Sequence, residues 1–231
     1  MSADGSRLVD LVGLTHVYRP GRPDQVVALR DLHLHVAAGE QVALVGPSGS
    51  GKTTLMGILA GLQRPGGGRA RVGGRDLGRL GGRERDDYRR ELVGYVWQAA
   101  ERGLWPGLNA LENVEAPMLD RPAAPEERRA RAERLLRTLG LGHRLRHRPA
   151  ELAAADRQRL AVAVALANEP ALLLADEPAD ELDRRTAQDL LGELGALLRE
   201  HGTTAVMASR DAGLGRFVDR TVELWAPDGG A

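Results

Sequence analysis

The sequence predicts an α/β fold whose core is a mostly parallel sheet, with an antiparallel β subdomain near the N-terminal end and an inserted helical subdomain. Three observations lead to this prediction. Short apolar segments typical of buried strands alternate with helical patterns along most of the chain. One of these strands, at residues 41–45, runs straight into a glycine-rich loop. Residues 99–150 contain helical patterns but no strand pattern.

The N-terminal part of the chain predicts antiparallel strands, followed by the first strand and helix of the core. Residues 7–18 are rich in valine and leucine and alternate with polar residues, and residues 32–36 alternate in the same way. Beyond the glycine-rich loop, residues 53–62 predict a helix that ends at the Gly/Pro cluster of residues 65–68.

The rest of the chain predicts a single domain with the helical insert in its middle. In chain order we expect a hairpin (69–80), a helix (83–92), a strand (93–97), three helices (110–118, 126–139, 156–167), a strand (171–175), a helix (184–200) and two strands (203–208, 220–225). Residues 1–231 then form one domain, in which 1–98 and 151–231 make the core with its β subdomain and 99–150 the helical subdomain.

Composition excludes several classes of function. Lys+Arg and Asp+Glu both total 32, so no overall field favours nucleic acid, and we expect no nucleic-acid partner. The absence of cysteine excludes disulfides and thiol catalysis and makes a cytoplasmic setting the simplest one. The longest uninterrupted apolar runs, at 160–167 and 171–175, are far shorter than the roughly 20 residues that span a bilayer.

The glycine-rich loop fits the phosphate-binding pattern G-x-x-x-x-G-K-[ST], between a predicted strand and a predicted helix. Its residues are Gly46, Pro47, Ser48, Gly49, Ser50, Gly51, Lys52 and Thr53. Glycines let backbone N–H groups turn inward around a phosphate, the lysine reaches the β/γ-phosphates, and the hydroxyl of Thr53 is a ligand for Mg²⁺. Lys52 is the only lysine among the 32 basic residues, so a compact ammonium occurs only in this loop.

A second motif is the acidic pair Asp176-Glu177, which directly follows the apolar segment 171–175. By itself such a pair is common at a strand end. Together with a phosphate-binding loop it predicts an aspartate that holds Mg²⁺ and a glutamate that positions or deprotonates the attacking water.

The order of these motifs resembles the ATP-binding cassette (ABC) family over essentially the whole chain. The resemblance implies a P-loop NTPase, RecA-like core with ATP and Mg²⁺ as cofactors. The resemblance also implies that Tyr18 stacks on adenine, and the alternative for this residue is local packing within its strand. It further implies that Thr54 contacts the nucleotide. Gln98, directly after the strand at 93–97, resembles the glutamine that touches Mg²⁺ and the water.

Other segments resemble the parts of the family that meet partners. Asp183, in Ala179-Asp180-Glu181-Leu182-Asp183, matches the aspartate of the loop that faces an opposing subunit. Gly94-Tyr95-Val96-Trp97-Gln98 and Leu111-Glu112-Asn113-Val114-Glu115 are most similar to the branch that contains lipoprotein-release and macrolide-export ATPases. The family implies a second ATPase subunit, a transmembrane permease and a position on the inner face of the membrane. For Trp105 the sequence leaves two alternatives, which are a docking surface for that permease and packing within the helical subdomain.

Two positions depart from the family pattern. The signature L-S-G-G-Q/E aligns with Leu152-Ala153-Ala154-Ala155-Asp156, so the hydroxyl that would reach the opposing γ-phosphate is missing at Ala153. Ala153 and Ala155 still offer backbone N–H groups, but alanine restricts the backbone more than glycine. Arg210 falls on the position of the switch histidine and keeps a positive charge with a different geometry.

Two functional hypotheses therefore remain open at this point. The first is an active transport ATPase, supported by the intact Lys52, Thr53, Gln98, Asp176 and Glu177. The second is an ATP-binding subunit that hydrolyses ATP weakly or not at all, as the degenerate half of a heterodimer or as a regulatory subunit, and it is motivated by Ala153 and Arg210. The candidate catalytic residues are Glu177, Gln98 and Arg210. A P-loop kinase or GTPase is disfavoured, because the base-reading motif N/T-K-x-D needs a second lysine.

Overall fold

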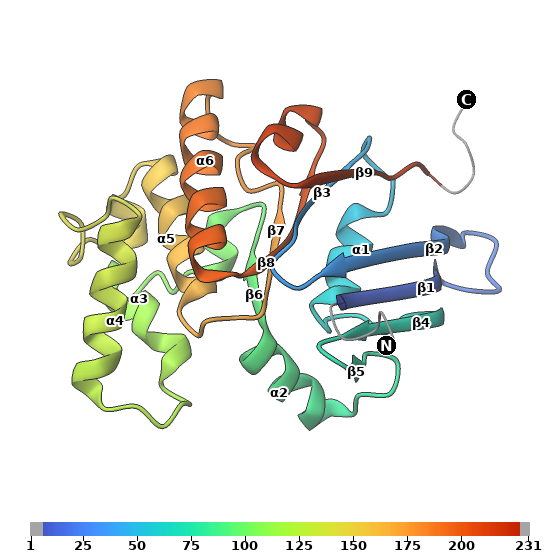
Figure 1. The fold of residues 1–231 in the computed structure, drawn as a ribbon, viewed down its shortest axis with the longest axis horizontal. Coiled ribbons are helices and arrows are strands. Elements are labelled where there is room, and N and C mark those ends of the chain that lie inside the picture. The colour runs from blue at the N-terminus through green and yellow to red at the C-terminus, as the bar shows by residue number, and fades with distance from the viewer. Residues whose placement is uncertain (1–6, 227–231) are drawn as a thin grey trace.

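Two sheets dominate the structure, a computed structural model that describes residues 7–226 (Figure 1). The parallel sheet has the order β6-β7-β8-β3-β9 and comprises β3 (Gln41–Val45), β6 (Val93–Val96), β7 (Leu172–Asp176), β8 (Thr204–Ser209) and β9 (Arg220–Glu223). The antiparallel sheet has the order β2-β1-β4-β5 and comprises β1 (Arg7–Tyr18), β2 (Val26–Ala37), β4 (Gly67–Val72) and β5 (Arg75–Asp76). The predicted fold class, an α/β core with an antiparallel β part, is confirmed.

The helices flank these sheets in the positions that Figure 1 shows. They are α1 (Lys52–Leu59), α2 (Gly82–Leu92), α3 (Ala110–Glu115), α4 (Pro125–Thr138), α5 (Ala154–Leu166) and α6 (Arg184–His201), with short 3₁₀ turns η2 (Ala100–Gly103), η3 (Ala116–Met118), η4 (Pro149–Glu151) and η5 (Ala212–Phe217). Helices α5 and α6 lie on one side of the parallel sheet, and α1 lies on the other side, towards the antiparallel sheet (Figure 1).

The parallel strands separate two hydrophobic clusters, because successive side chains of a strand point to opposite faces. In β3, Val42 and Leu44 pack with α1 and the antiparallel sheet. Ala43 and Val45 of the same strand pack with α5, α6 and the helices of residues 110–139. All five residues of β3 are buried, so a continuous apolar run in the sequence marks a strand that is covered on both faces.

Most element boundaries differ from the expected ones by a few residues, but the strand expected at 32–36 already begins at Val26, where it pairs with Tyr18 of β1. The helix after the glycine-rich loop ends at Leu59 rather than 62, since Gly61 adopts a left-handed φ of 67° and turns the chain. The helix expected at 110–118 ends at Glu115 and continues as a 3₁₀ turn that contains Pro117, which lacks the N–H that an α-helix needs.

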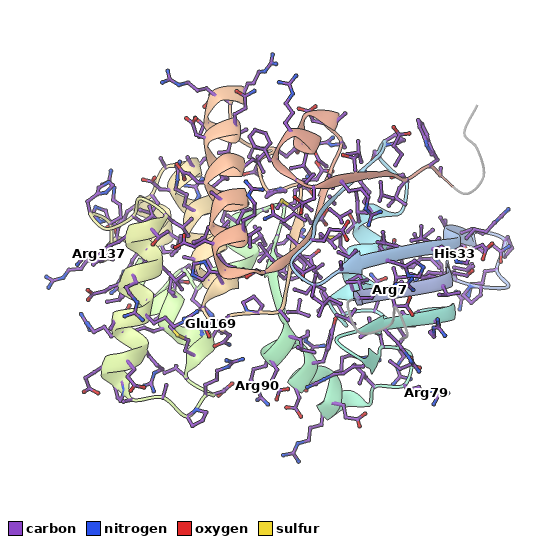
Figure 2. All side chains as sticks on the ribbon, in the orientation of Figure 1. Arg7, His33, Arg79, Arg90, Arg137 and Glu169 are labelled. Carbon is purple, nitrogen blue, oxygen red and sulfur yellow. The ribbon has the colours of Figure 1, made fainter. Side chains whose placement is uncertain are left out.

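Residues 99–150 contain α- and 3₁₀-helices and no strand. Helix α4 packs into the core through Ala132 and Leu136, and Arg131 bonds it to the end of α5. Arg131 donates from Nε to the carbonyl of Ala167 at 2.7 Å and from Nη2 to the carbonyl of Leu166 at 3.3 Å, at the end of α5. Its remaining guanidinium nitrogen pairs with Glu169. Charged side chains of this region, such as Arg137 on α4, project outward in Figure 2.

Within residues 7–226, none of the helices is both long enough and apolar enough to cross a membrane.

Four loops begin at the side of the parallel sheet where the carboxyl ends of its strands lie. Parallel strands all end at the same side of a sheet, and ligand sites of α/β folds form there. Val45 is in register with Ser209, and Asp176 with Ala208. The loops that follow β3, β6, β7 and β8 therefore begin close together, although up to about 160 residues separate them in the chain.

Candidate nucleotide-binding site

The glycine-rich loop connects β3 to α1, and two of its glycines leave no room for a side chain. A Cβ on Gly46 would lie 2.1 Å from the carbonyl oxygen of Leu224, and one on Gly51 would lie 2.4 Å from that of Ala28. Gly51 also has a left-handed φ of 88°. The loop thus approaches the backbone of two other segments more closely than any other residue type allows.

Gly51→Ala is expected to destabilise the chain by about 2–5 kcal/mol, because a left-handed alanine costs about 1–2 kcal/mol and the clash with Ala28 adds about 1–3. Gly49→Ala is a matched control, since Gly49 has a φ of 82° but open space around the Cβ position. Chemical denaturation of both variants separates the two effects. Equal losses of unfolding free energy would show that the contact with Ala28 does not constrain the loop.

The loop curls around the ammonium of Lys52, the first residue of α1. Its Nζ donates to the carbonyl of Gly46 at 2.7 Å, to the carbonyl of Pro47 at 2.9 Å and to the hydroxyl of Ser50 at 3.4 Å. Lys52 is only 5% exposed, and burial lowers its pKa, while the nearby carboxylates of Glu177 and Asp176 act in the opposite direction. The cation is thus buried within electrostatic reach of one acid at the end of β7 and of a second acid directly after it.

Asp176 ends β7 and faces the first turn of α1. Burial raises the pKa of its carboxyl group, while hydrogen bonds from Thr53 and Tyr95 and the charge of Lys52 act to lower it. Burial also raises the pKa of the Tyr95 hydroxyl. Thr53 itself is exposed on the open side of the loop. The structure therefore brings together the hydroxyl and the carboxylate that the sequence paired as Mg²⁺ ligands.

Glu177, Arg210, Asp180 and Gln98 form a connected group beside this site. Arg210 donates from Nε to Oε2 of Glu177 at 2.9 Å and from Nη2 to Oδ2 of Asp180 at 2.6 Å. The amide of Gln98 donates to the same oxygen of Asp180 at 3.4 Å. Glu177 adopts a left-handed φ of 50°, an uncommon conformation for this residue type that is often found at functional sites.

Tyr18 lies at the end of β1 and reaches α1 with its hydroxyl group. The hydroxyl is 3.1 Å from the hydroxyl of Thr54 and donates to Oε1 of Gln63 at 2.9 Å. Its ring meets that of His16 edge to face at 4.8 Å. The ring is 36% exposed beside the phosphate-binding loop, a position compatible with stacking on a base. Its adenine contact stays a prediction.

Comparison with known protein families identifies the family of this chain. The family model described as "ABC transporter" matches residues 29–180, well over half of the chain. The chain belongs to the ABC transporter family. The match includes the phosphate-binding loop and the Asp176-Glu177 pair, so the resemblance in the sequence is confirmed.

Individual relatives of this ABC protein place it in the expected branch. It is 43% identical to the lipoprotein-releasing system ATP-binding protein LolD of Cereibacter sphaeroides, over 96% of this chain and 98% of that protein. It is 41% identical to the macrolide export ATP-binding/permease protein MacB of Marinobacter nauticus over 94% of this chain, which spans 33% of that longer protein. Both names belong to the predicted branch of lipoprotein-release and macrolide-export proteins.

Solved structures of ABC cassettes share the fold. The dimeric structure of the ATP-binding cassette MJ0796 in a post-hydrolysis state, bound to ADP and Pi, is 36% identical with a TM-score of 0.84, covering 94% of each chain. A second dimeric structure of MJ0796, described as a bacterial ABC transporter cassette, matches with the same values.

The signature region of this ABC cassette lies at the start of α5. Ala153 is the N-cap of α5, and both Ala153 and Ala154 are exposed. Its side chain makes no capping hydrogen bond, so the first N–H groups of α5 lack the acceptor that serine supplies elsewhere. No hydrogen bond or ion pair described for residues 7–226 links Ala153 or Ala155 to Lys52.

Ala153→Ser is expected to raise the free energy of unfolding by about 1 kcal/mol, because Ala153 already has the extended backbone of an N-cap. Ala154→Ser is the matched control, since Ala154 is equally exposed but is the first residue inside the helix. Urea denaturation measures both. No gain from Ala153→Ser would mean that water already satisfies the N-terminal N–H groups.

Asp183 has a role within the chain that the sequence analysis did not identify. Its Oδ1 accepts hydrogen bonds from the backbone N–H groups of Arg185 and Thr186, both at 3.1 Å, and so caps α6. The hydroxyl of Thr186 donates to Oδ2 at 2.6 Å, and these bonds lower the pKa of the Asp183 carboxyl group. Its contact with an opposing subunit stays a prediction.

Sequence reasoning also missed Asp180, Tyr95 and Gln63 as parts of the site. Asp180 lies in the loop between Glu177 and Asp183, but nothing in the local sequence connects it to Arg210, 30 residues later. Tyr95 belongs to a strand pattern, and from the neighbouring strand its hydroxyl acts to lower the pKa of Asp176. Gln63 follows α1 and holds Tyr18 from 45 residues away. For each of these three residues, the role depends on a partner from a segment far away in the chain, so only the pairing of those segments could have revealed it.

Proposed function

We propose that this chain is the ATP-binding and ATP-hydrolysing subunit of an ABC transporter, and that it powers a separate transmembrane partner through ATP-driven closure of a dimer. One observation carries this proposal. The buried ammonium of Lys52, the first residue of α1, lies within electrostatic reach of Asp176, the last residue of β7, and of Glu177, which follows it. A cation in a phosphate cradle beside two acids is the arrangement that phosphoryl transfer from ATP requires.

The residues present fit a nucleotide phosphate and Mg²⁺. Lys52 now bonds two backbone carbonyls of its own loop, and phosphate oxygens would replace them as acceptors. The hydroxyl of Thr53 and the carboxylate of Asp176 are hard oxygen donors of the kind that Mg²⁺ prefers, and the amide oxygen of Gln98 completes the proposed set. Mg²⁺ held by these residues would offset the negative charge of the phosphate groups.

The catalytic roles are assigned to three residues. Glu177 accepts a proton from the attacking water, or orients that water, through its carboxylate. Gln98 orients the same water with its side-chain amide, and Arg210 supplies positive charge next to the reacting phosphate. Tyr18 stacks on the adenine ring, and Thr54 contacts the phosphates from the first turn of α1. The remaining nucleotide contacts come from the backbone N–H groups of residues 46–51.

A second subunit completes each site in this proposal. Ala153, Ala155 and Asp183 lie on surfaces of this chain that would face the phosphate-binding loop of the partner. Because Ala153 lacks a hydroxyl group, one hydrogen bond to a charged phosphate is missing in every site that this chain completes. Such a bond contributes about 1.5–3 kcal/mol, so we propose that turnover is about 10- to 150-fold slower than with serine at this position.

A surface for the transmembrane partner is proposed at Trp105. The side chain of Trp105 is 64% exposed, which contradicts the alternative of packing within the helical subdomain. Its backbone is fixed, because the buried side chain of Asn113 accepts from the N–H of Trp105 at 2.7 Å and donates to its carbonyl at 3.1 Å. An exposed indole on a fixed backbone is typical of an interface. Attachment there would place the chain on the cytoplasmic face of the membrane.

The test is ATP hydrolysis and ATP binding by the purified chain over a range of protein concentrations, with Mg²⁺ and with EDTA. We expect ATP binding and Mg²⁺-dependent phosphate release that rises more steeply than linearly with protein concentration, because two subunits share each site. Binding without measurable turnover would favour the weakly hydrolysing subunit of a heterodimer. Absence of ATP binding would overturn both hypotheses.

A further inference from the structure

Asp180 lies at the junction of three loops of the proposed site, although none of the roles above uses it. It belongs to the loop after β7, and its Oδ2 accepts hydrogen bonds from Arg210 in the loop after β8 and from Gln98 in the loop after β6. Asp180 therefore connects two of the three residues to which catalytic roles are assigned.

The arrangement divides one edge of a guanidinium between two carboxylates. Nε and Nη2 of arginine form the edge that binds a carboxylate through two parallel hydrogen bonds. In this chain Nε of Arg210 bonds Oε2 of Glu177 at 2.9 Å, and Nη2 bonds Oδ2 of Asp180 at 2.6 Å. Arg210 is thus bonded to Glu177 through one of the two nitrogens that could engage it.

The backbone that carries the two carboxylates is held by hydrogen bonds. The N–H of Glu177 donates to the carbonyl of Ala208 at 2.9 Å, and the N–H of Asp180 donates to the carbonyl of Glu177 at 3.3 Å. The Glu177 side chain is 13% exposed, compared with 49% for Arg210. Arg210 is therefore the most exposed side chain of the three, and the position of its guanidinium group depends on the acceptors that the two carboxylates offer.

We propose that Asp180 is a positioning residue for Arg210: by occupying Nη2 it limits the Arg210–Glu177 contact to one hydrogen bond and leaves Oε1 of Glu177 free for a water molecule. Without Asp180, Nη2 turns to Oε1, and both oxygens of Glu177 are occupied. This inference rests on the proposed role of Glu177 in hydrolysis. The electrostatics agree with the geometry, because the hydrogen bond and charge of Glu177 and the charge of Asp180 raise the pKa of Arg210.

The kinetic test is a double-mutant cycle between Asp180→Asn and Arg210→Gln, with kcat and KM for ATP measured separately. We expect Asp180→Asn to lower kcat by about tenfold with little change in KM, and to change kcat by less than about twofold when Arg210 is already glutamine. Asp180→Glu keeps a carboxylate at this position and is expected to stay within about threefold of the unchanged chain. An equal loss of kcat in both backgrounds would overturn the proposal.

Asp87→Asn is the matched control, because Asp87 pairs with Arg90 on α2 at comparable side-chain exposure, 36% and 40% against 34% and 49% for Asp180 and Arg210. Figure 2 shows Arg90 on the periphery of the molecule. The control is expected to leave kcat unchanged. A loss equal to that of Asp180→Asn would mean that removing any surface aspartate lowers activity, and would count against the proposal.

A structural test does not depend on hydrolysis. In crystals of nucleotide-free Asp180→Asn we expect Nε and Nη2 of Arg210 to bond both oxygens of Glu177. An Arg210 that keeps a single bond to Glu177, or turns into solvent, would overturn the inference. If the unchanged chain fails to hydrolyse ATP, the proposed function fails, and the crystal structure still decides the role of Asp180.

Discussion

Replacement of Glu177 by glutamine is expected to lower ATP turnover by about 10²–10⁴-fold while ATP binding stays close to that of the unchanged chain, because the loss is confined to general-base catalysis. Glutamine has nearly the same shape as glutamate and keeps a carbonyl oxygen for the bond from Nε of Arg210. Its neutral amide does not accept the proton of an attacking water. The left-handed backbone at residue 177 and its N–H bond to Ala208 do not involve the side chain.

Steady-state phosphate release measures the turnover of Glu177→Gln, and an equilibrium binding assay measures its affinity for ATP. Glu193→Gln is the matched control, because Glu193 also accepts a bond from an arginine Nε, that of Arg159 at 3.1 Å, outside the proposed site. It is expected to leave turnover unchanged. Turnover of Glu177→Gln within tenfold of the unchanged chain would assign the proton acceptor to another group.

Lys52→Ala is expected to weaken ATP binding by roughly 10- to 150-fold, since a hydrogen bond to a charged group contributes about 1.5–3 kcal/mol. Lys52→Arg is expected to weaken ATP binding nearly as much as Lys52→Ala does. The ammonium lies 2.7 Å from the carbonyl of Gly46 and 2.9 Å from that of Pro47, inside a loop whose glycines already touch other backbone segments. A planar guanidinium is larger and does not fit the same space.

Isothermal titration with ATP measures both variants. Arg90→Lys is the matched control for the reverse exchange, because Arg90 pairs with Asp87 on the surface of α2. The affinity of the Arg90→Lys variant for ATP is expected to equal that of the unchanged chain. Normal ATP affinity in Lys52→Arg would show that the loop needs only a positive charge, and the single lysine of this arginine-rich chain would then have no special role.

The sequence predicted the elements of the site that are local in the chain. The spacing of Gly46, Gly51, Lys52 and Thr53 defines a loop by itself, because the backbone that surrounds a phosphate is made by consecutive residues. An apolar segment that ends in two acids likewise marks a strand that delivers carboxylates to the edge of a sheet. Both motifs lie inside the segment that matches the ABC transporter family, residues 29–180.

The tertiary structure decided which side chains from different loops meet. Arg210 and Gln98 both bond Asp180 only because β6, β7 and β8 are adjacent and parallel, so that their carboxyl ends lie at the same side of the sheet. A hydrogen bond over such a distance in the chain depends on strand order, and strand order leaves no trace in local composition or periodicity.

The same distinction separates what the sequence by itself determined from what required the fold. Family, fold class and phosphate-binding loop follow from short motifs and from the alternation of apolar residues, which are properties of neighbouring residues. The uncapped start of α5 at Ala153, the exposure of Trp105 and the sharing of Arg210 by two carboxylates follow from packing. Packing fixes side chains through contacts between segments that the chain brings together only when it folds.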